Sequence, residues 1–116
     1  MNYRIINKTK SIVLSQKAKK ADNFFKRFLG LMLKKNMEWE EALIFYHSPS
    51  IHTFFMKIPI DVVFLDKNMQ VLRIVENLKS GKIISCFKSL VTIEFPVHKT
   101  SKSSLEVGDI LEIVTS

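Results

Sequence analysis

The stretch SIHTFFMKIPIDVVFLDKNMQVLRIVE, residues 50–76, decides the fold class of this chain. It is the most hydrophobic part of the sequence, and its many β-branched and aromatic residues favour strands. Val62–Leu65 has no polar residue at alternate positions, as expected of a strand that is covered on both faces. Asp66–Met69 is a polar turn, after which Val71–Glu76 returns as the next strand. The stretch therefore predicts two or three strands joined by tight turns.

The flanking segments continue this pattern towards both ends of the chain. Tyr3–Asn7 and Ser11–Gln16 alternate well enough to form a hairpin. Residues 77–88 are expected to be irregular, with a turn at Gly81. The remaining strands are predicted at Ala42–Tyr46, Ile51–Lys57, Leu90–Phe95 and after a turn at Gly108-Asp109. Seven or eight short strands without a strand-helix-strand rhythm indicate a mainly β fold, a small antiparallel barrel or sandwich.

One short amphipathic helix is predicted within residues 17–30. Ala21, Phe24, Phe25 and Phe28 fall at positions i, i+3, i+4 and i+7, which places three aromatic rings on one face. Gly30 stands where a left-handed residue would end the helix. The rings could form a stacking platform for single-stranded nucleic acid, but packing against a sheet explains the helical spacing better.

Two polar connections complete the secondary-structure prediction. Asn36–Glu41 is expected to be irregular, with Trp39 folded back onto the core because an exposed indole wastes apolar area. Pro96–Ser104 is expected to contain at most one helical turn.

Length and composition favour one domain spanning residues 1–116. The chain has 116 residues and 47% hydrophobic content, enough for a core without a disulfide or a structural metal. Its single cysteine, Cys86, has no internal partner, which fits a reducing compartment. No apolar run approaches a membrane span or a signal peptide. We therefore expect a soluble, cytoplasmic protein.

The net charge of +7 is compatible with a protein that binds nucleic acid. However, 15 of the 18 cationic residues are lysine, a mix that an A/T-rich coding bias also produces. We favour a solvated surface. The nucleic-acid alternative would use the basic cluster between Lys17 and Lys35, which comprises Lys17, Lys19, Lys20, Lys26, Lys34 and Lys35.

Three blocks of sequence carry a family resemblance: Arg27-Phe-Leu-Gly-Leu-Met32, Ile51–Asp66 and Val107-Gly-Asp109. In order and spacing they resemble the domain of unknown function 192 family, which is uncharacterised and mostly prokaryotic, over about residues 18–114. The middle block is specific, whereas Gly-Asp occurs in many β folds. The resemblance implies a compact, mainly β single domain and carries no established activity.

The chain departs from the family pattern at three positions. Similar members often have cysteine where Ser48 stands, so a cysteine nucleophile or ligand there is excluded. They often have glycine where Met69 and His98 stand. Because Met69 is not glycine, we predict a type I turn or a wider loop at Asp66–Met69, with Met69 outside the positive-φ region.

The candidate residues for chemistry are Arg27, His52, Asp61, Glu94 and Asp109. We expect an ion pair between Arg27 and Asp61 that ties the helix to the sheet, with Glu94 as the fallback partner. Asp109 most simply caps a turn by accepting backbone N–H groups.

His52 shares a strand face with Phe54 and Met56, which favours a core or rim histidine over a catalytic one. The functional alternative pairs His52 with Asp61 at the mouth of a β cavity. The residues we predict to bind a ligand in that cleft are His52, Thr53, Met56, Asp61 and Arg27.

No motif names a reaction. The sequence lacks the usual metal-ligand spacings, a Gly-x-Ser-x-Gly elbow and a glycine-rich phosphate loop, so we predict no metal and no cofactor. The favoured function is a binding module, either for a small ligand near His52 and Asp61 or for another protein through a sheet edge. The alternatives are a hydrolase or lyase that uses His52 with Asp61 or Glu94, which we favour less, and nucleic-acid binding through the basic cluster.

Overall fold

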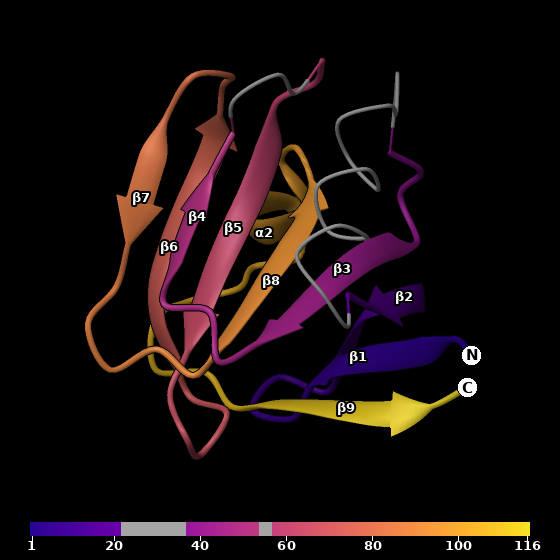
Figure 1. The fold of residues 1–116 in the computed structure, drawn as a ribbon. Helices are drawn as coiled ribbons and strands as arrows, with labels where there is room; N and C mark the ends of the chain where they lie inside the picture. The colour runs from indigo at the N-terminus through magenta and orange to yellow at the C-terminus, as the bar shows by residue number, and fades with distance from the viewer. Residues whose placement is uncertain (22–36, 54–56) are drawn as a thin grey trace.

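The computed structural model describes residues 1–21, 37–53 and 57–116, and of His52 only the backbone. Within these residues, seven strands form a curled half-barrel sheet in the order β6-β5-β8-β3-β2-β1-β9, and β4 and β7 form a second sheet (Figure 1). The elements are β1 (Tyr3–Asn7), β2 (Ile12–Lys20), β3 (Glu41–Tyr46), β4 (Ser50–His52), β5 (Ile60–Leu65), β6 (Val71–Leu78), β7 (Ile83–Ser85), β8 (Val91–Pro96), α2 (Lys99–Lys102) and β9 (Leu111–Thr115). The predicted mainly β fold is confirmed, with β2–β3 as its one parallel pair among the described strands.

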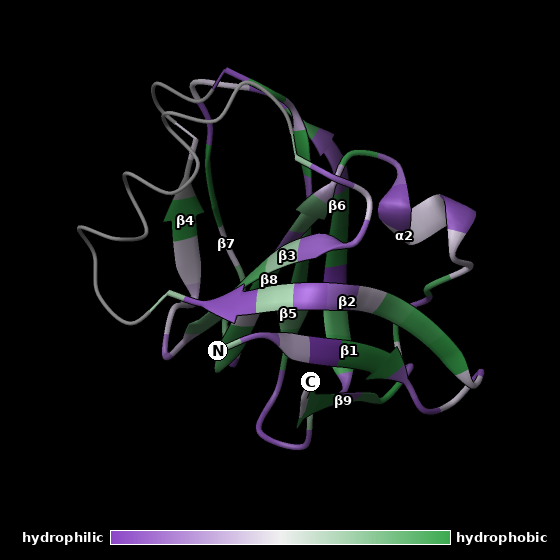
Figure 2. Cartoon of the chain, turned by 90° about the vertical axis from the view of Figure 1, so that its right-hand side faces the viewer, coloured by the Kyte–Doolittle hydropathy of each residue, from purple (hydrophilic) through white to green (hydrophobic). Residues whose placement is uncertain are grey.

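The large sheet curls so strongly that β1, β2 and β9 cross over β5, β6 and β8 at a wide angle, with α2 to one side (Figure 2). The chain ends lie together, since β1 pairs with β9 and the N–H of Ser116 donates to the carbonyl of Asn2 at 3.0 Å. A single antiparallel bridge between Gln70 and Ile110 links the start of β6 to the start of β9. Beyond this bridge the two strands separate, and the barrel stays open there.

The strand β5 is covered by a hydrophobic core on each of its two faces. All six of its residues are buried. Val63 and Leu65 belong to the core inside the curl, whereas Val62 and Phe64 belong to a second core that also contains Ile51 of β4. Since successive side chains of a strand point to opposite faces, β5 serves both cores. The predicted two-sided burial of Val62–Leu65 is confirmed.

Two predicted element boundaries are wrong. Lys17–Lys20, the predicted start of the helix, continues β2 and pairs in parallel with β3 from Lys17↔Glu41 to Lys20↔Ile44. The buried Ala18 between exposed lysines gives this segment strand alternation, and tertiary pairing then outweighs its helical propensity. Residues 22–30 of the predicted helix lie outside the described residues. The strand predicted at Ile51–Lys57 is shorter in the structure, where β4 ends at His52. Lys57 lies in a bend before Pro59, and residues 54–56 lie outside the described residues.

The prediction for Met69 is also wrong, because its φ is 63°. Its N–H donates to the carbonyl of Asp66 at 3.0 Å, and its own carbonyl accepts the N–H of Leu111 at 2.9 Å. Asp66 Oδ1 accepts two further N–H groups of the turn, from Asn68 and Gln70. These bonds and the packing of Met69 against the inner core offset the cost of the left-handed backbone.

Trp39 does not fold back onto the core as predicted, since 44% of it is exposed. The ammonium group of Lys99 lies 4.3 Å from its ring centroid and donates to its carbonyl at 2.8 Å. The indole therefore covers a buried lysine of α2, and the ring's attraction for a cation explains its place on the surface.

Candidate functional site

Asp61 is fully buried on β5, and its surroundings give it a structural role. Oδ1 accepts the N–H groups of Asn77 and His98, at 3.0 and 3.1 Å. Oδ2 accepts both the N–H and the hydroxyl of Thr100, at 3.0 and 2.7 Å. A carboxylate offers about four acceptor sites, so these bonds use them all. Asp61 thus ties β5 to β6 and to the first turn of α2.

Thr53 is fully buried as well and anchors the loop between β6 and β7. Its hydroxyl donates to the carbonyl of Lys79 at 2.7 Å and accepts the N–H of Lys82 at 2.9 Å. Its carbonyl accepts the N–H of Gly81 at 3.2 Å. Gly81 has a φ of 83°, so the turn predicted there is present.

Glu94 is buried on β8, but the sheet separates it from Asp61. Asp61 is opposite Phe95 and Glu94 is opposite Val62 in the β5–β8 ladder. Because neighbouring residues of a strand alternate between faces, the two carboxylates point to opposite sides of the sheet. The pairing of His52 or Arg27 with Asp61 or Glu94 stays a prediction, since Arg27, Met56 and the side chain of His52 lie outside the described part.

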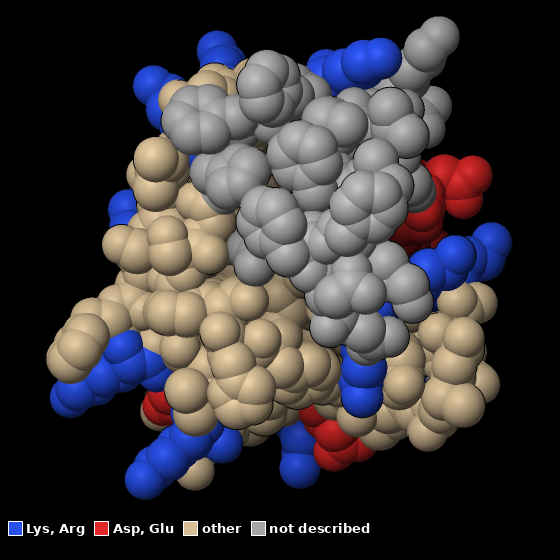
Figure 3. All heavy atoms as spheres, viewed as in Figure 1, with Lys and Arg blue, Asp and Glu red and all other residues tan. Residues whose placement is uncertain are grey.

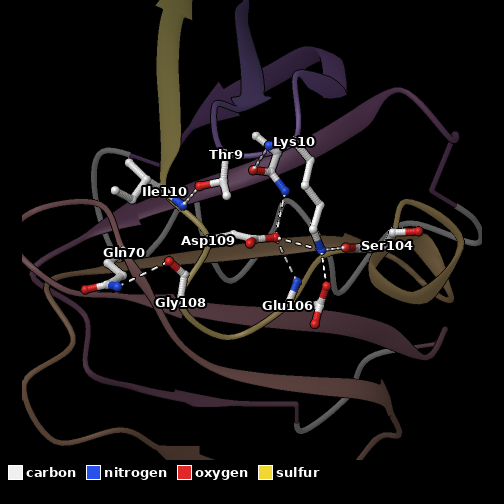
Figure 4. Close-up of polar contacts among 9 residues, drawn as sticks. Thr9, Lys10, Gln70, Ser104, Glu106, Gly108, Asp109 and Ile110 are labelled. Atoms are coloured by element: carbon white, nitrogen blue, oxygen red, sulfur yellow. Dashed lines mark hydrogen bonds and ion pairs between the residues drawn. The ribbon is translucent and has the colours of Figure 1, made fainter.

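A cluster around Asp109 joins segments from the two ends of the chain (Figure 4). Asp109 Oδ2 accepts the Asn7 amide at 2.8 Å and the Glu106 N–H at 3.0 Å, and it lies 3.3 Å from Lys10 Nζ. Lys10 Nζ also donates to Glu106 Oε1 and to the carbonyl of Ser104. The predicted turn-capping role of Asp109 is confirmed, and the cluster holds residues 104–110 on the β1–β2 turn.

The charges of this cluster stabilise each other. Burial raises the pKa of Asp109, but hydrogen bonds from the Glu106 N–H, Asn7 and Lys10 outweigh it, so the pKa lies below its usual value. The hydrogen bond to Glu106 is the main reason why the pKa of Lys10 is raised. Both groups are therefore charged at neutral pH. Asn7 and Lys10 carried no signal in the sequence, because about a hundred residues separate them from Asp109.

A groove that the sequence did not reveal runs beside β9. It has a volume of about 370 Å³ and is lined by Lys8, Tyr46, Asn68, Met69 and the four consecutive residues 110–113. Ile110 and the first three residues of β9 are consecutive, so the groove follows the edge of β9. β9 pairs with β1 on one side, and its other edge has no strand partner among the described residues.

Backbone hydrogen bonds show which residues of β9 face the groove. The carbonyl of Ile110 accepts the N–H of Lys8, so even-numbered residues turn their backbone groups towards β1. The N–H of Leu111 points the other way, to the carbonyl of Met69. Backbone groups in an antiparallel pair alternate in direction, which turns the N–H and C=O of Ile113 towards the groove.

The basic cluster is only partly described. Lys17 and Lys19 are exposed on β2, and Lys20 Nζ lies 4.5 Å from the Tyr3 ring centroid and 5.1 Å from that of Tyr46. Lys26, Lys34 and Lys35 lie outside the described residues. In the view of Figure 3, Lys and Arg side chains occupy several separate places around the margin. Nucleic-acid binding through this cluster stays a prediction.

The described residues contain no group of three or more His, Cys, Asp or Glu that could hold a metal ion. They also include no helix with the length and hydrophobicity needed to cross a membrane.

Residues 5–113 match the family model DUF192, described as "Uncharacterized ACR". A UPF0127 protein of Pyrococcus abyssi is 38% identical in an alignment 118 positions long, gaps included, that covers 96% of this chain and 97% of that protein. A UPF0127 protein of Thermococcus sibiricus is 38% identical over 111 residues, 90% of this chain and 71% of the relative.

Two solved structures share the fold at 19% identity. A protein of unknown function from Novosphingobium aromaticivorans has a TM-score of 0.80 and is matched over 95% of this chain and 82% of its own. A Sinorhizobium meliloti protein described as a "putative transcription regulator" has a TM-score of 0.81, with 95% and 90% covered. The predicted resemblance is confirmed: the chain belongs to the uncharacterised DUF192 (UPF0127) family.

Proposed function

We propose that this domain is a protein-binding module that takes up an extended peptide as an additional strand beside β9. The observation that carries this proposal is the groove along the unpaired edge of β9, onto which Ile113 turns both of its backbone hydrogen-bonding groups. Addition of a strand to a sheet edge is a common mode of peptide recognition, in which main-chain bonds supply affinity.

The neighbouring turn already begins the pairing that a peptide would continue. Gln70 bridges Ile110, and the carbonyl of Met69 accepts the N–H of Leu111. Because the bridge is antiparallel, β6 runs from it in the direction opposite to β9 and pairs with β5, so it is the Asp66–Met69 turn, rather than β6, that lies beside β9. A peptide that enters beyond Met69 would exchange hydrogen bonds with Ile113, as a further strand of the sheet does.

The side chains of the groove favour an apolar residue in the peptide. Tyr46, Met69 and Ile113 supply apolar surface, and an ion pair of 3.5 Å between Lys8 and Glu112 lies at the rim. Two copies of the chain could pair their β9 edges in the same way. Each copy carries a net charge of +7, so repulsion disfavours this dimer and favours a neutral or acidic peptide.

The test is selection of short peptides from a random phage-displayed library on the purified protein, followed by affinity measurement. Ile113→Pro removes the N–H that faces the groove and leaves the bonds to β1 in place, a position where an edge strand tolerates proline. Ile113→Ala removes more of the side chain but keeps the N–H. We expect Ile113→Pro to weaken binding of selected peptides at least tenfold and Ile113→Ala to weaken it less.

Three results would contradict the proposal. Equal losses for both variants would show that side-chain contacts alone carry binding. A small molecule that binds the groove regardless of Ile113→Pro would make it a ligand pocket, for which its volume is adequate. A dimer seen by light scattering that Ile113→Pro dissociates would show that β9 pairs with a second copy.

A further inference from the structure

A second surface, away from the groove, lies on β7 and the loop that follows it. Ile83 is 67% exposed, Phe87 89% and Leu90 40%. Ile83, Ser85 and Phe87 are alternate residues, and all three are exposed, whereas Ile84 and Cys86 between them are half-buried. We call Ile83, Phe87 and Leu90 the β7 apolar strip.

The fold holds this strip outward. In the loop after β7, the N–H of Cys86 donates to the carbonyl of Pro49 at 2.8 Å, and the N–H of Leu90 donates to that of Leu65 at 2.8 Å. The buried hydroxyl of Ser89 contacts the carbonyls of Leu65 and Val91. Phe87 therefore projects from a loop that is bonded to the sheet on both sides, and its exposure is a property of the folded chain.

The surroundings of the strip are cationic. Residues 77–93 contain three lysines, Lys79, Lys82 and Lys88, and no aspartate or glutamate. All three are exposed, as is Arg73 of β6, whose Nη1 donates to the carbonyl of Ser85 at 2.9 Å. In Figure 3 the left side, where Figure 1 places β7 and its loop, has Lys and Arg beside mostly uncharged side chains, with a small Asp/Glu patch at its lower end.

We propose that the β7 apolar strip attaches this domain to a lipid bilayer that contains anionic lipids. The apolar side chains enter the interface, and the flanking cations meet the headgroup charge, so both contributions to peripheral membrane binding are present. A single-stranded nucleic acid would also attract the cations, but it stacks on rings, and two of the three apolar side chains here are aliphatic.

The test is co-sedimentation of the full chain with vesicles of phosphatidylcholine and phosphatidylglycerol at a 7:3 ratio, compared with phosphatidylcholine alone. Lys88→Glu and Lys17→Glu change the net charge equally, but only Lys88 borders the strip. We expect Lys88→Glu to weaken binding to the anionic vesicles about fivefold or more, and Lys17→Glu by less than about twofold. Phe87→Ser should weaken it about tenfold. Since Phe87 is almost fully exposed, its replacement should leave the melting temperature unchanged.

Several results would overturn the proposal. These are no binding to the anionic vesicles at low salt, no effect of Phe87→Ser, or equal effects of the two lysine variants. If the vesicles stay unbound while Phe87→Ser weakens binding to a single-stranded oligothymidine, the surface belongs to nucleic acid.

Discussion

Two single residues of this chain have left-handed backbones at positions where the family resemblance led us to expect glycine. These are Met69 and His98, with φ values of 63° and 70°. Glycine adopts this conformation without steric cost, whereas for other residues it raises the free energy of the folded chain by roughly 1–2 kcal/mol. Met69 and His98 therefore hold a conformation that glycine would adopt more easily.

We therefore expect His98→Gly to raise the free energy of unfolding by about 0.5–1 kcal/mol. The variant relieves the backbone, and it loses only a surface contact of 3.2 Å between His98 and Glu76, which contributes little. His98→Ala is the matched control, because it loses the same contact and keeps the strain. Urea unfolding measures both variants, and a His98→Gly protein no more stable than His98→Ala would contradict the argument.

Asp109 should make stability depend on acidic pH. Its pKa in the folded chain lies below the ordinary 3.8, so its charged form stabilises the fold fully above that value. This contribution is lost as the pH falls through the pKa of the folded chain. Asp109→Asn should cost roughly 2–3 kcal/mol at pH 7 and have a smaller effect at the lowest pH where both proteins stay folded. Urea unfolding from pH 7 downward checks this, and a constant difference between the proteins would disagree with it.

At the scale of elements, the short helix α2 contains a buried lysine, Lys99, whose charged form is disfavoured by burial. Burial lowers the pKa of Lys99, and the nearby Glu40 carboxylate only partly offsets this. Because the pKa of Lys99 is lowered on folding, the charged lysine makes the folded state less stable. This stability is regained as the pH rises towards 10.5, where the unfolded chain also loses the proton. We expect the wild type to gain stability relative to Lys99→Met between pH 8 and pH 10.5, measured by thermal or urea unfolding. A pH-independent difference would show that the Lys99 ammonium is effectively solvated.

Elements with strong alternation could be predicted, and those that depend on distant partners could not. β1, β8 and β9 follow from apolar residues at period two, β3 and β5 from short continuous apolar runs, and all five from the turn residues between them. β7 has only three residues, too few for a clear alternation, and it exists because β4 pairs with it. The Asp109 turn was foreseen from its own residues. The groove was not, since its walls come from β3, the β5–β6 turn and β9.

At the scale of the whole molecule, the net charge of +7 does not indicate where a binding surface lies. The described lysines are spread over several elements, and two of them form ion pairs, Lys8 with Glu112 and Lys10 with Glu106. The useful signal is local: residues 77–93 lack acids, and the sheet presents their apolar side chains outward. The two proposed surfaces share no lining residue, so a peptide and a membrane could be bound by the same copy.

The pairing of β1 with β9 also determines when the fold can be completed. Tyr3 lies opposite Thr115, so the outer edge of the large sheet forms only after the first and last strands have met. Closing so long a loop is slow relative to forming hairpins, because chain entropy is lost before the contacts compensate for it. During synthesis on a ribosome, the edge of β1 stays uncovered until β9 has been made. Lys10 likewise lacks its partner Asp109 until then. The arrival of β9 therefore determines how long the edge of β1 is exposed to aggregation.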